Sequence, residues 1–296
     1  MQGPLLYGTI LAGMKRPHPL ESSIHRLTPA IATALLLISC GTASLPSTSA
    51  LLRGTTHLMQ HQSYRSGIQG VITFDTGHIS GPPSLVAALQ KTYRQKITES
   101  GTLIKNRQGD YSLSLSITNQ GLTRQSCAIE AGTTLYYSTD CKTYIPTATS
   151  GPSPLIYRYT PMYLLASLTG ARETGLPGRS GPGEITVSGN LASTARASVI
   201  AATASSLGFS SLAPAITILS AVATMTINPR NYEPSQTTLT IAMAVQVGPL
   251  LQDLVNNSGT GKPIPDRLLP QGELDFTEII TTHPGGFGGN YPVHLP

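Results

Sequence analysis

The chain has 296 residues, of which 40% are hydrophobic and only 11% are charged, with 29 glycines, 23 prolines and no tryptophan. This composition favours strands and turns and disfavours a bundle of long charged helices. The net charge is +5, and it falls to +3 for residues 40–296, where 16 basic residues stand against 13 acidic ones. Because these basic residues are scattered and form no run, we expect no nucleic-acid partner.

The first 39 residues have the organisation of a secretory signal peptide. Basic residues, among them Lys15 and Arg16, precede an uncharged stretch at 27–39. This stretch is too short to span a bilayer as a stable helix, as is usual for the apolar region of a signal peptide. Met14 is a more typical start for such a signal than Met1, so the 13 residues before it are interpreted as an extension.

The uncharged stretch ends in Leu37-Ile38-Ser39-Cys40. A branched apolar residue, a tolerant position, a small residue and a cysteine form the lipobox, and the sequence therefore resembles a bacterial lipoprotein precursor. The resemblance implies cleavage before Cys40, a diacylglyceryl thioether on its sulphur and an acylated amino group, which together anchor a protein without a transmembrane helix. Gly41 in place of the inner-membrane retention signal Asp implies the outer membrane, facing the periplasm. The alternative is an ordinary secretory signal in which Cys40 stands by chance.

The two other cysteines, Cys127 and Cys141, form an even pair in a chain predicted to be exported, so we expect a disulfide. The alternatives are two buried thiols or a metal pair, and no histidine lies near enough in sequence to favour zinc. His57 and His61 have the spacing of helical ligands but lack a third. Gly54 argues against a helix there, so we interpret both histidines as surface residues of a linker, and we expect no metal site and no cofactor.

Residues 40–68 are predicted to be a lipidated tether, and residues 69–142 a first α+β unit that contains the disulfide. The clearest strand alternates apolar residues with serine and threonine, which is typical of a sheet with one packed and one wet face. The predicted strands of this unit are 71–74, 111–118, 122–129 and 133–138.

One helix is expected to cover the apolar face of this sheet. Its apolar residues recur at every fourth position, Ser84 is its candidate N-cap and Gly101 ends it. The four residues of the stripe are Leu85, Leu89, Tyr93 and Ile97.

Residues 143–184 are predicted to be a Pro/Gly-rich loop, residues 185–256 a second α+β unit and residues 257–296 a flexible tail. The second unit combines a strand, a helix of small residues and an antiparallel β-hairpin. Its predicted elements are a strand at 185–188, a helix at 191–207 and hairpin strands at 217–227 and 237–247. The fold class is therefore α+β, with antiparallel sheets and few helices.

The hairpin allows an alternative function. Its strands are about eleven residues long, which is the length that a tilted strand needs to cross a bilayer. A lipoprotein that inserted residues 217–247 would be a subunit of an outer-membrane pore or secretion channel. The more economical interpretation is a hairpin half-buried in a soluble sheet.

Asp75-Thr76-Gly77 resembles the signature of the aspartic proteases, in which two such aspartates share a proton. A single copy would require a homodimer, and the simpler interpretation is a turn in which Asp75 caps backbone amides. We therefore expect a lipid-anchored envelope protein with a structural, assembly or binding role and no catalysis. Its expected partners are the membrane, through Cys40, an envelope protein and possible further copies of itself.

Overall fold

A computed structural model describes residues 45–148, 153–174, 183–206, 215–257 and 264–296 of the chain. The predicted signal peptide and Cys40 lie outside the described residues, and so does 175–182 of the predicted loop. Everything described belongs to one compact unit that spans residues 45–296.

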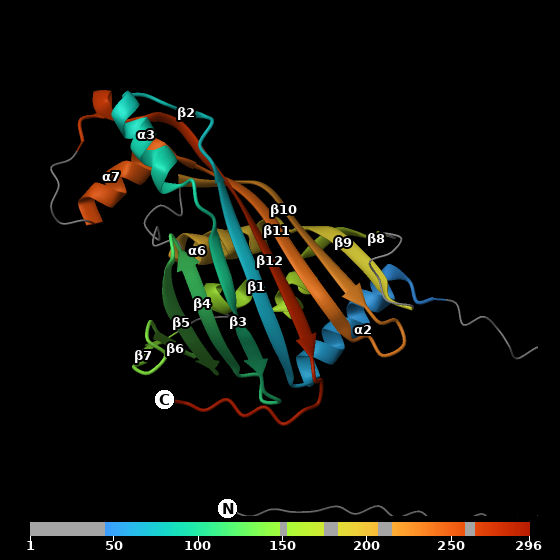
Figure 1. Cartoon of the computed structure of the whole chain (residues 1–296). Helices are drawn as coiled ribbons and strands as arrows, with labels where there is room; N and C mark the ends of the chain where they lie inside the picture. Colours follow the sequence, from blue (N-terminus) through green and yellow to red (C-terminus); the bar gives the residue numbers. More distant parts are fainter. Residues whose placement is uncertain (1–44, 149–152, 175–182, 207–214, 258–263) are drawn as a thin grey trace, which may run out of the picture. The chain divides into compact units, whose positions relative to one another are not determined.

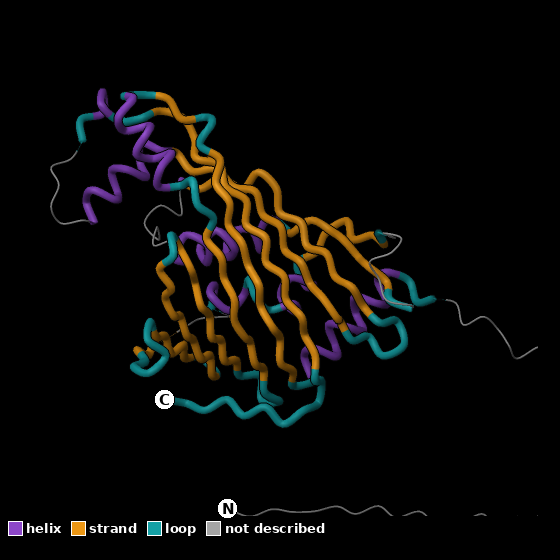
Figure 2. The backbone as a smooth tube through the Cα atoms, in the orientation of Figure 1, coloured by secondary structure: helices purple, strands orange, loops and turns teal. Residues whose placement is uncertain are grey.

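The fold is mainly β, with some helices, and its centre is a single antiparallel sheet of 12 strands (Figures 1 and 2). The strand order is β7-β6-β5-β4-β3-β1-β12-β11-β10-β9-β8, and β2 pairs with the end of β12. Two meanders therefore run outward from the central pair β1 and β12. The bounds are β1 Tyr64–Asp75, β2 Ile79–Ser80, β3 Ile97–Lys105, β4 Tyr111–Asn119, β5 Leu122–Ala131, β6 Thr134–Ser138, β7 Ile145–Ala148, β8 Leu168–Glu173, β9 Ile185–Leu191, β10 Ile216–Ile227, β11 Pro234–Gln246 and β12 Gln271–Gly285.

Alternation of side chains decides which face of the sheet is covered. In β4, Tyr111, Leu113 and Leu115 are buried, whereas Ser112 and Ser114 point to the other face and remain partly or fully exposed. In the hairpin of β10 and β11, alternate apolar residues are buried from Ala221 to Ile227 and from Leu239 to Val245, whereas Leu219 is 57% exposed beside a register shift in β10. The predicted strands of both segments are confirmed, and the period-2 pattern explains them.

Helices cover one face of the sheet. Figure 1 shows α2 and α6 behind the strands with the short helices α4 and α5 between α2 and α6, whereas α3 and α7 lie together at the upper left, beside β2 and the upper end of β12. α2 contacts α5, and α4 contacts α6. The bounds are α2 Thr48–His61, α3 Pro83–Thr92, α4 Pro154–Tyr157, α5 Pro161–Ala166, α6 Ser193–Ser206 and α7 Val247–Asn257, with a 3-10 turn at Asp266–Leu268.

The expected division into two α+β units is wrong, because β1 of the first pairs with β12 near the end of the chain. The segment expected to be a flexible tail supplies β12, the strand at the centre of the sheet. Its pattern is hard to recognise, because two polar residues occupy buried positions. Glu278 lies between Phe276 and Ile280, and Thr282 follows Ile280 on the same face. A polar residue at a core position conceals a strand from a search for apolar alternation.

The described residues of the expected tether, 45–68, are also structured. They form α2, which buries Leu51, Thr55 and Met59 along one face, and the first half of β1. Gly54 does not break α2, because a methyl group at that position would lie 2.5 Å from Cδ1 of Tyr232. The glycine allows the helix to approach the turn between β10 and β11, a packing reason that outweighs its low helix propensity.

The helix expected over the first sheet is shorter and lies elsewhere. α3 ends at Thr92, and Ile97 begins β3. The N-cap is Pro82 instead of Ser84, and no side chain caps the helix. Gly101 lies inside β3, where an added methyl group would overlap the carbonyl oxygen of Ser114 on β4. The apolar residues spaced four apart thus belong to two elements: Leu85 and Leu89 lie on α3, Tyr93 is its C-cap, and Ile97 belongs to the strand that follows.

The described part of 143–184 is not a continuous loop. It contains β7 at one edge of the sheet, β8 at the other edge, and α4 and α5 between them. Prolines begin both helices, at Pro154 and Pro161, where the missing N–H costs nothing. The prolines that indicated a loop are therefore helix starts.

Candidate functional site

Cys127 and Cys141 are joined at disulfide distance, with 2.05 Å between their sulphur atoms. Cys127 lies on β5, and Cys141 lies in the turn after β6. Asp140 organises this turn, because its Oδ1 accepts hydrogen bonds from the backbone N–H groups of Lys142 and Thr143 at 2.8 Å each. These hydrogen bonds hold the pKa of Asp140 well below its usual range.

The histidine pair lies on a helix after all. His57 and His61 are both on α2, with their ring centroids 4.5 Å apart. Within the described residues, no group of three or more His, Cys, Asp and Glu side chains is arranged to hold a metal ion. The same part of the chain has no helix that is both long and apolar enough to cross a membrane.

Charged side chains are buried between the sheet and its helices. Arg158, which follows α4, donates from Nη2 to Glu99 on β3 at 2.9 Å and from Nη1 to Glu278 on β12 at 2.5 Å. Tyr159 donates to the other oxygen of Glu99 at 2.7 Å, and Thr203 on α6 donates to the other oxygen of Glu278 at 2.8 Å. We call these five residues the buried ion cluster. It connects two central strands with two helices.

The charges of the cluster do not balance when both carboxyl groups are ionised. Burial alone would lower the pKa of Arg158, but the adjacent Glu278 and Glu99 outweigh it and raise the pKa, so the guanidinium stays charged. Burial raises the pKa of Glu278 by more than Arg158 lowers it. A neutral Glu278 would leave one cation facing one anion, which is the arrangement a buried site tolerates best.

Sequence reasoning missed this cluster completely. Arg158 lies in the segment expected to be a loop, Glu278 in the expected tail and Glu99 next to the expected end of a helix. Their sequence separations are 59 and 120 residues, so no local spacing relates them. The one signal was a pair of isolated acidic residues in otherwise apolar or threonine-rich segments, which alone does not identify a partner.

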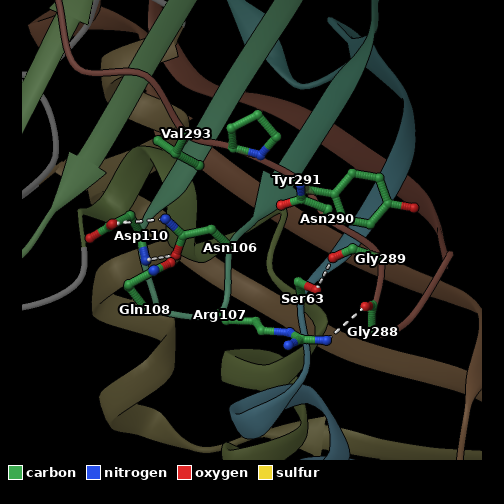
Figure 3. A pocket seen from close by; sticks show the side chains of 11 residues that line it. Ser63, Asn106, Arg107, Gln108, Asp110, Gly288, Gly289, Asn290, Tyr291 and Val293 are labelled. Carbon is green, nitrogen blue, oxygen red and sulfur yellow. Dashed lines mark hydrogen bonds between the residues drawn. The ribbon is translucent and has the colours of Figure 1, made fainter.

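A polar cavity of about 590 Å³, shown in Figure 3, lies at the end of the sheet opposite α3 (Figure 1). Three segments line it: Ser63 before β1, the turn 106–110 between β3 and β4, and 288–293 after β12. The turn is rigid, because Asn106 and Asp110 exchange two hydrogen bonds of 2.9 Å. The cavity therefore joins parts of the chain that are far apart in sequence.

The C-terminal segment is fastened across this cavity. Ser63 Oγ donates to the carbonyl oxygen of Gly289 at 2.5 Å, and Arg107 donates to that of Gly288 at 3.0 Å. Side chains on Gly286 or Gly289 would overlap the ring of Tyr291, so the glycines let the chain fold back on itself. Because an arginine has five donors, Arg107 has N–H groups left for a polar ligand beside the amides of Gln108 and Asn290.

Asp75 occupies a turn at the end of β1. Its Oδ1 accepts a hydrogen bond from the N–H of Gly77 at 2.8 Å, which is the capping role expected of a turn residue. Asp275 on β12 lies directly opposite Asp75 in the register and contacts His78 at 2.8 Å. The side chain of His78 is 68% exposed, so this group lies in water and not in an enclosed site.

Comparison of the sequence with protein-family models and with curated proteins finds no match. The function therefore has to follow from these residues themselves.

Proposed function

We propose that the chain is a lipid-anchored protein of the cell envelope, held by Cys40 at the outer membrane and facing the periplasm, with a non-catalytic binding or assembly role. The observation that carries the proposal is the use of the cysteines. The chain has three, and the fold brings Cys127 and Cys141 to disulfide distance, which leaves Cys40 over. That cysteine is the last residue of the lipobox.

The disulfide supports an exported location, and the short distance in sequence between Cys40 and α2 supports the lipid anchor. Disulfides form and persist in exported proteins and are rare in the cytosol. Seven residues separate Cys40 from Thr48, the first residue of α2. The eight Cα–Cα steps between them span at most about 29 Å, so an acylated Cys40 would keep the folded unit near the membrane surface.

The binding role is supported by the form of the sheet. Its helix-covered face holds the core, while its second face presents serine and threonine side chains, and the polar cavity lies at one end. The alternative of a pore subunit receives less support, because the apolar side chains of the β10 and β11 hairpin, such as Leu239 and Ile241, are fully buried in the chain's own core. They would have to leave that core to meet lipid.

Cell fractionation of two variants tests the anchor. Cys40→Ala removes the thiol that forms the thioether, and we expect the protein to move from the membrane fraction to the soluble fraction. Thr42→Ala is the matched control, since it changes a nearby residue but keeps the lipobox, and it should remain in the membrane fraction. The anchor is disproved if the wild type is soluble, or if Cys40→Ala stays with the membrane as the control does.

A further inference from the structure

A second cavity, of about 340 Å³, lies between the sheet and the C-terminal end of α3. All its strand residues belong to the helix-covered face. Its apolar walls come from β1, α3 and its end, β3, β4 and β5, and they are Ile72, Phe74, Tyr93, Ile97, Ile117 and Leu122. We call it the apolar pocket, and its volume is in the range of sites for small ligands.

The walls of the apolar pocket are held in place. The rings of Phe74 and Tyr93 lie 5.0 Å apart, which joins β1 to the end of α3. Gln120, in the turn between β4 and β5, donates from Nε2 to the carbonyl oxygen of Thr92 at 3.0 Å. Burial in these apolar surroundings raises the pKa of Tyr93 to about 12. The pocket is therefore preformed, which lowers the ordering cost of binding.

The inner end of the pocket is Glu99 of the buried ion cluster, whose two oxygens already accept from Arg158 and Tyr159. The outer end is open, and Leu122 there is 70% exposed. An apolar side chain this exposed at the entrance of an apolar pocket extends the surface that an apolar ligand would cover.

One basic residue lines the apolar pocket, and three more adjoin its lining residues in sequence. Arg124 lines it from β5, and three further cations lie on or just after α3, next to lining residues in sequence: Lys91, Arg94 and Lys96. Within the described residues, none of these four cations forms an ion pair. Residues 76–98 contain no Asp or Glu, and the nearest acid before them, Asp75, points to the other face of β1. The entrance is therefore complementary to an anion.

We propose that the apolar pocket binds an amphiphile with an acyl chain and an anionic head group. The chain enters between Phe74, Tyr93 and Ile117, and the head group stays at the entrance beside Arg124 and the cations after α3. Both a phospholipid phosphate and a fatty-acid carboxylate have this chemistry. The inference rests on the proposed binding role in the envelope, but it does not require the lipid anchor.

Calorimetric titration tests the pocket in the full chain carrying Cys40→Ala, which can be purified without detergent. The probe is lysophosphatidylglycerol below its micellar concentration, with lysophosphatidylcholine of the same chain length as the zwitterionic comparison and glycerol phosphate as the head group alone. We expect one molecule of the anionic lipid to bind per chain, weaker binding of the zwitterionic lipid and no binding of glycerol phosphate. A fatty acid of the same chain length distinguishes the two head groups. Affinity equal to that of lysophosphatidylglycerol would mean that the pocket accepts any anionic head group, and weaker affinity would mean that it prefers the phosphate.

Two matched pairs of variants locate the binding. Leu122→Glu places a charge at the entrance and should weaken binding about tenfold or more, whereas Ile145→Glu, at a 65% exposed residue of β7, should not. Arg124→Glu should weaken binding of the anionic lipid about threefold at low salt and leave binding of the zwitterionic lipid unchanged. Arg230→Glu should change the affinity for neither lipid. Unchanged thermal unfolding of the four variants verifies the fold.

The proposal is overturned if the anionic lipid does not bind, if Leu122→Glu and Ile145→Glu bind equally well, or if Arg124→Glu affects both lipids alike. None of these results bears on the anchor, because Cys40 is absent from every protein in the titration. Fractionation of the wild type and Cys40→Ala decides the anchor separately, so a failure of either proposal is distinguishable from a failure of the other.

Discussion

Arg158 donates a hydrogen bond of 2.5 Å to Glu278, a residue 120 positions further along the chain. This contact fastens the connection after α4 to the central strand β12, and the second contact of Arg158, to Glu99, fastens it to β3. Both strands lie within one strand of β1, at the centre of the sheet. The buried ion cluster therefore holds the helices over the region where the two meanders meet.

Removing the cation of the cluster should be strongly destabilising. Arg158→Met leaves Glu99 and Glu278 buried without their partner, and we expect the free energy of unfolding to fall by about 3–5 kcal/mol. Urea unfolding at neutral pH measures the loss. The triple variant R158M/E99Q/E278Q has no charge left in the buried ion cluster and should recover part of the loss. A triple variant less stable than Arg158→Met would contradict this account.

Stability should depend on pH through Glu278. Because burial raises the folded-state pKa of Glu278, its folded form binds more protons than the unfolded form. The stability from this group is thus fully present below the unfolded pKa of about 4.3 and is lost as the pH rises through the folded pKa. Glu278→Gln should flatten the decline, with rising pH above about 4.3, of the free energy of unfolding measured in urea. A variant with the same decline as the wild type would show that another group causes it.

The disulfide should stabilise the meander β3 to β7. Its cysteines are 14 residues apart, and closing a loop of that size contributes about 3 kcal/mol in the chain-entropy model. We expect the double variant C127S/C141S to lose that amount in urea unfolding. Reduction of the wild type should reproduce the loss, and an unchanged midpoint after verified reduction would be evidence against it.

Gly54 should tolerate no side chain while Tyr232 is present. Gly54→Ala brings a methyl group to 2.5 Å from the Tyr232 ring, and overpacking of this kind costs about 1–3 kcal/mol. Tyr232→Ala removes the ring, so the double variant should lose less than the sum of the two single losses. Simple additivity in thermal unfolding would mean that α2 and the turn between β10 and β11 do not press on one another.

The sequence predicts those elements whose local pattern agrees with their place in the fold. β4, most of β10 and the middle of β11 alternate because one face of each is apolar and buried, although a register shift in β10 leaves Leu219 exposed. β3 and β12 escaped prediction because Glu99 and Glu278 occupy core positions, where only a distant arginine makes them tolerable. The pairing of distant residues is a tertiary fact, and a local pattern does not contain it.

The same distinction between local pattern and tertiary contact applies to the candidate sites. The pairing of Cys127 with Cys141 needs only the count of cysteines and the compartment, and it agrees with the distance between their sulphur atoms. The polar cavity and the apolar pocket each combine three or more segments, so their residues acquire a common meaning only when the sheet is assembled. The linker interpretation of His57 failed because Gly54 was taken for a helix breaker when it is a contact residue.

The most direct test of the central claim is the intact mass of the protein extracted from membranes with detergent, before and after reduction. The account predicts a chain that begins at Cys40, carries the added mass of glyceryl and acyl groups, and gains the mass of two hydrogen atoms on reduction. A chain without acyl mass, or one that still carries residues 1–39, would contradict the lipid anchor and the envelope location inferred from it.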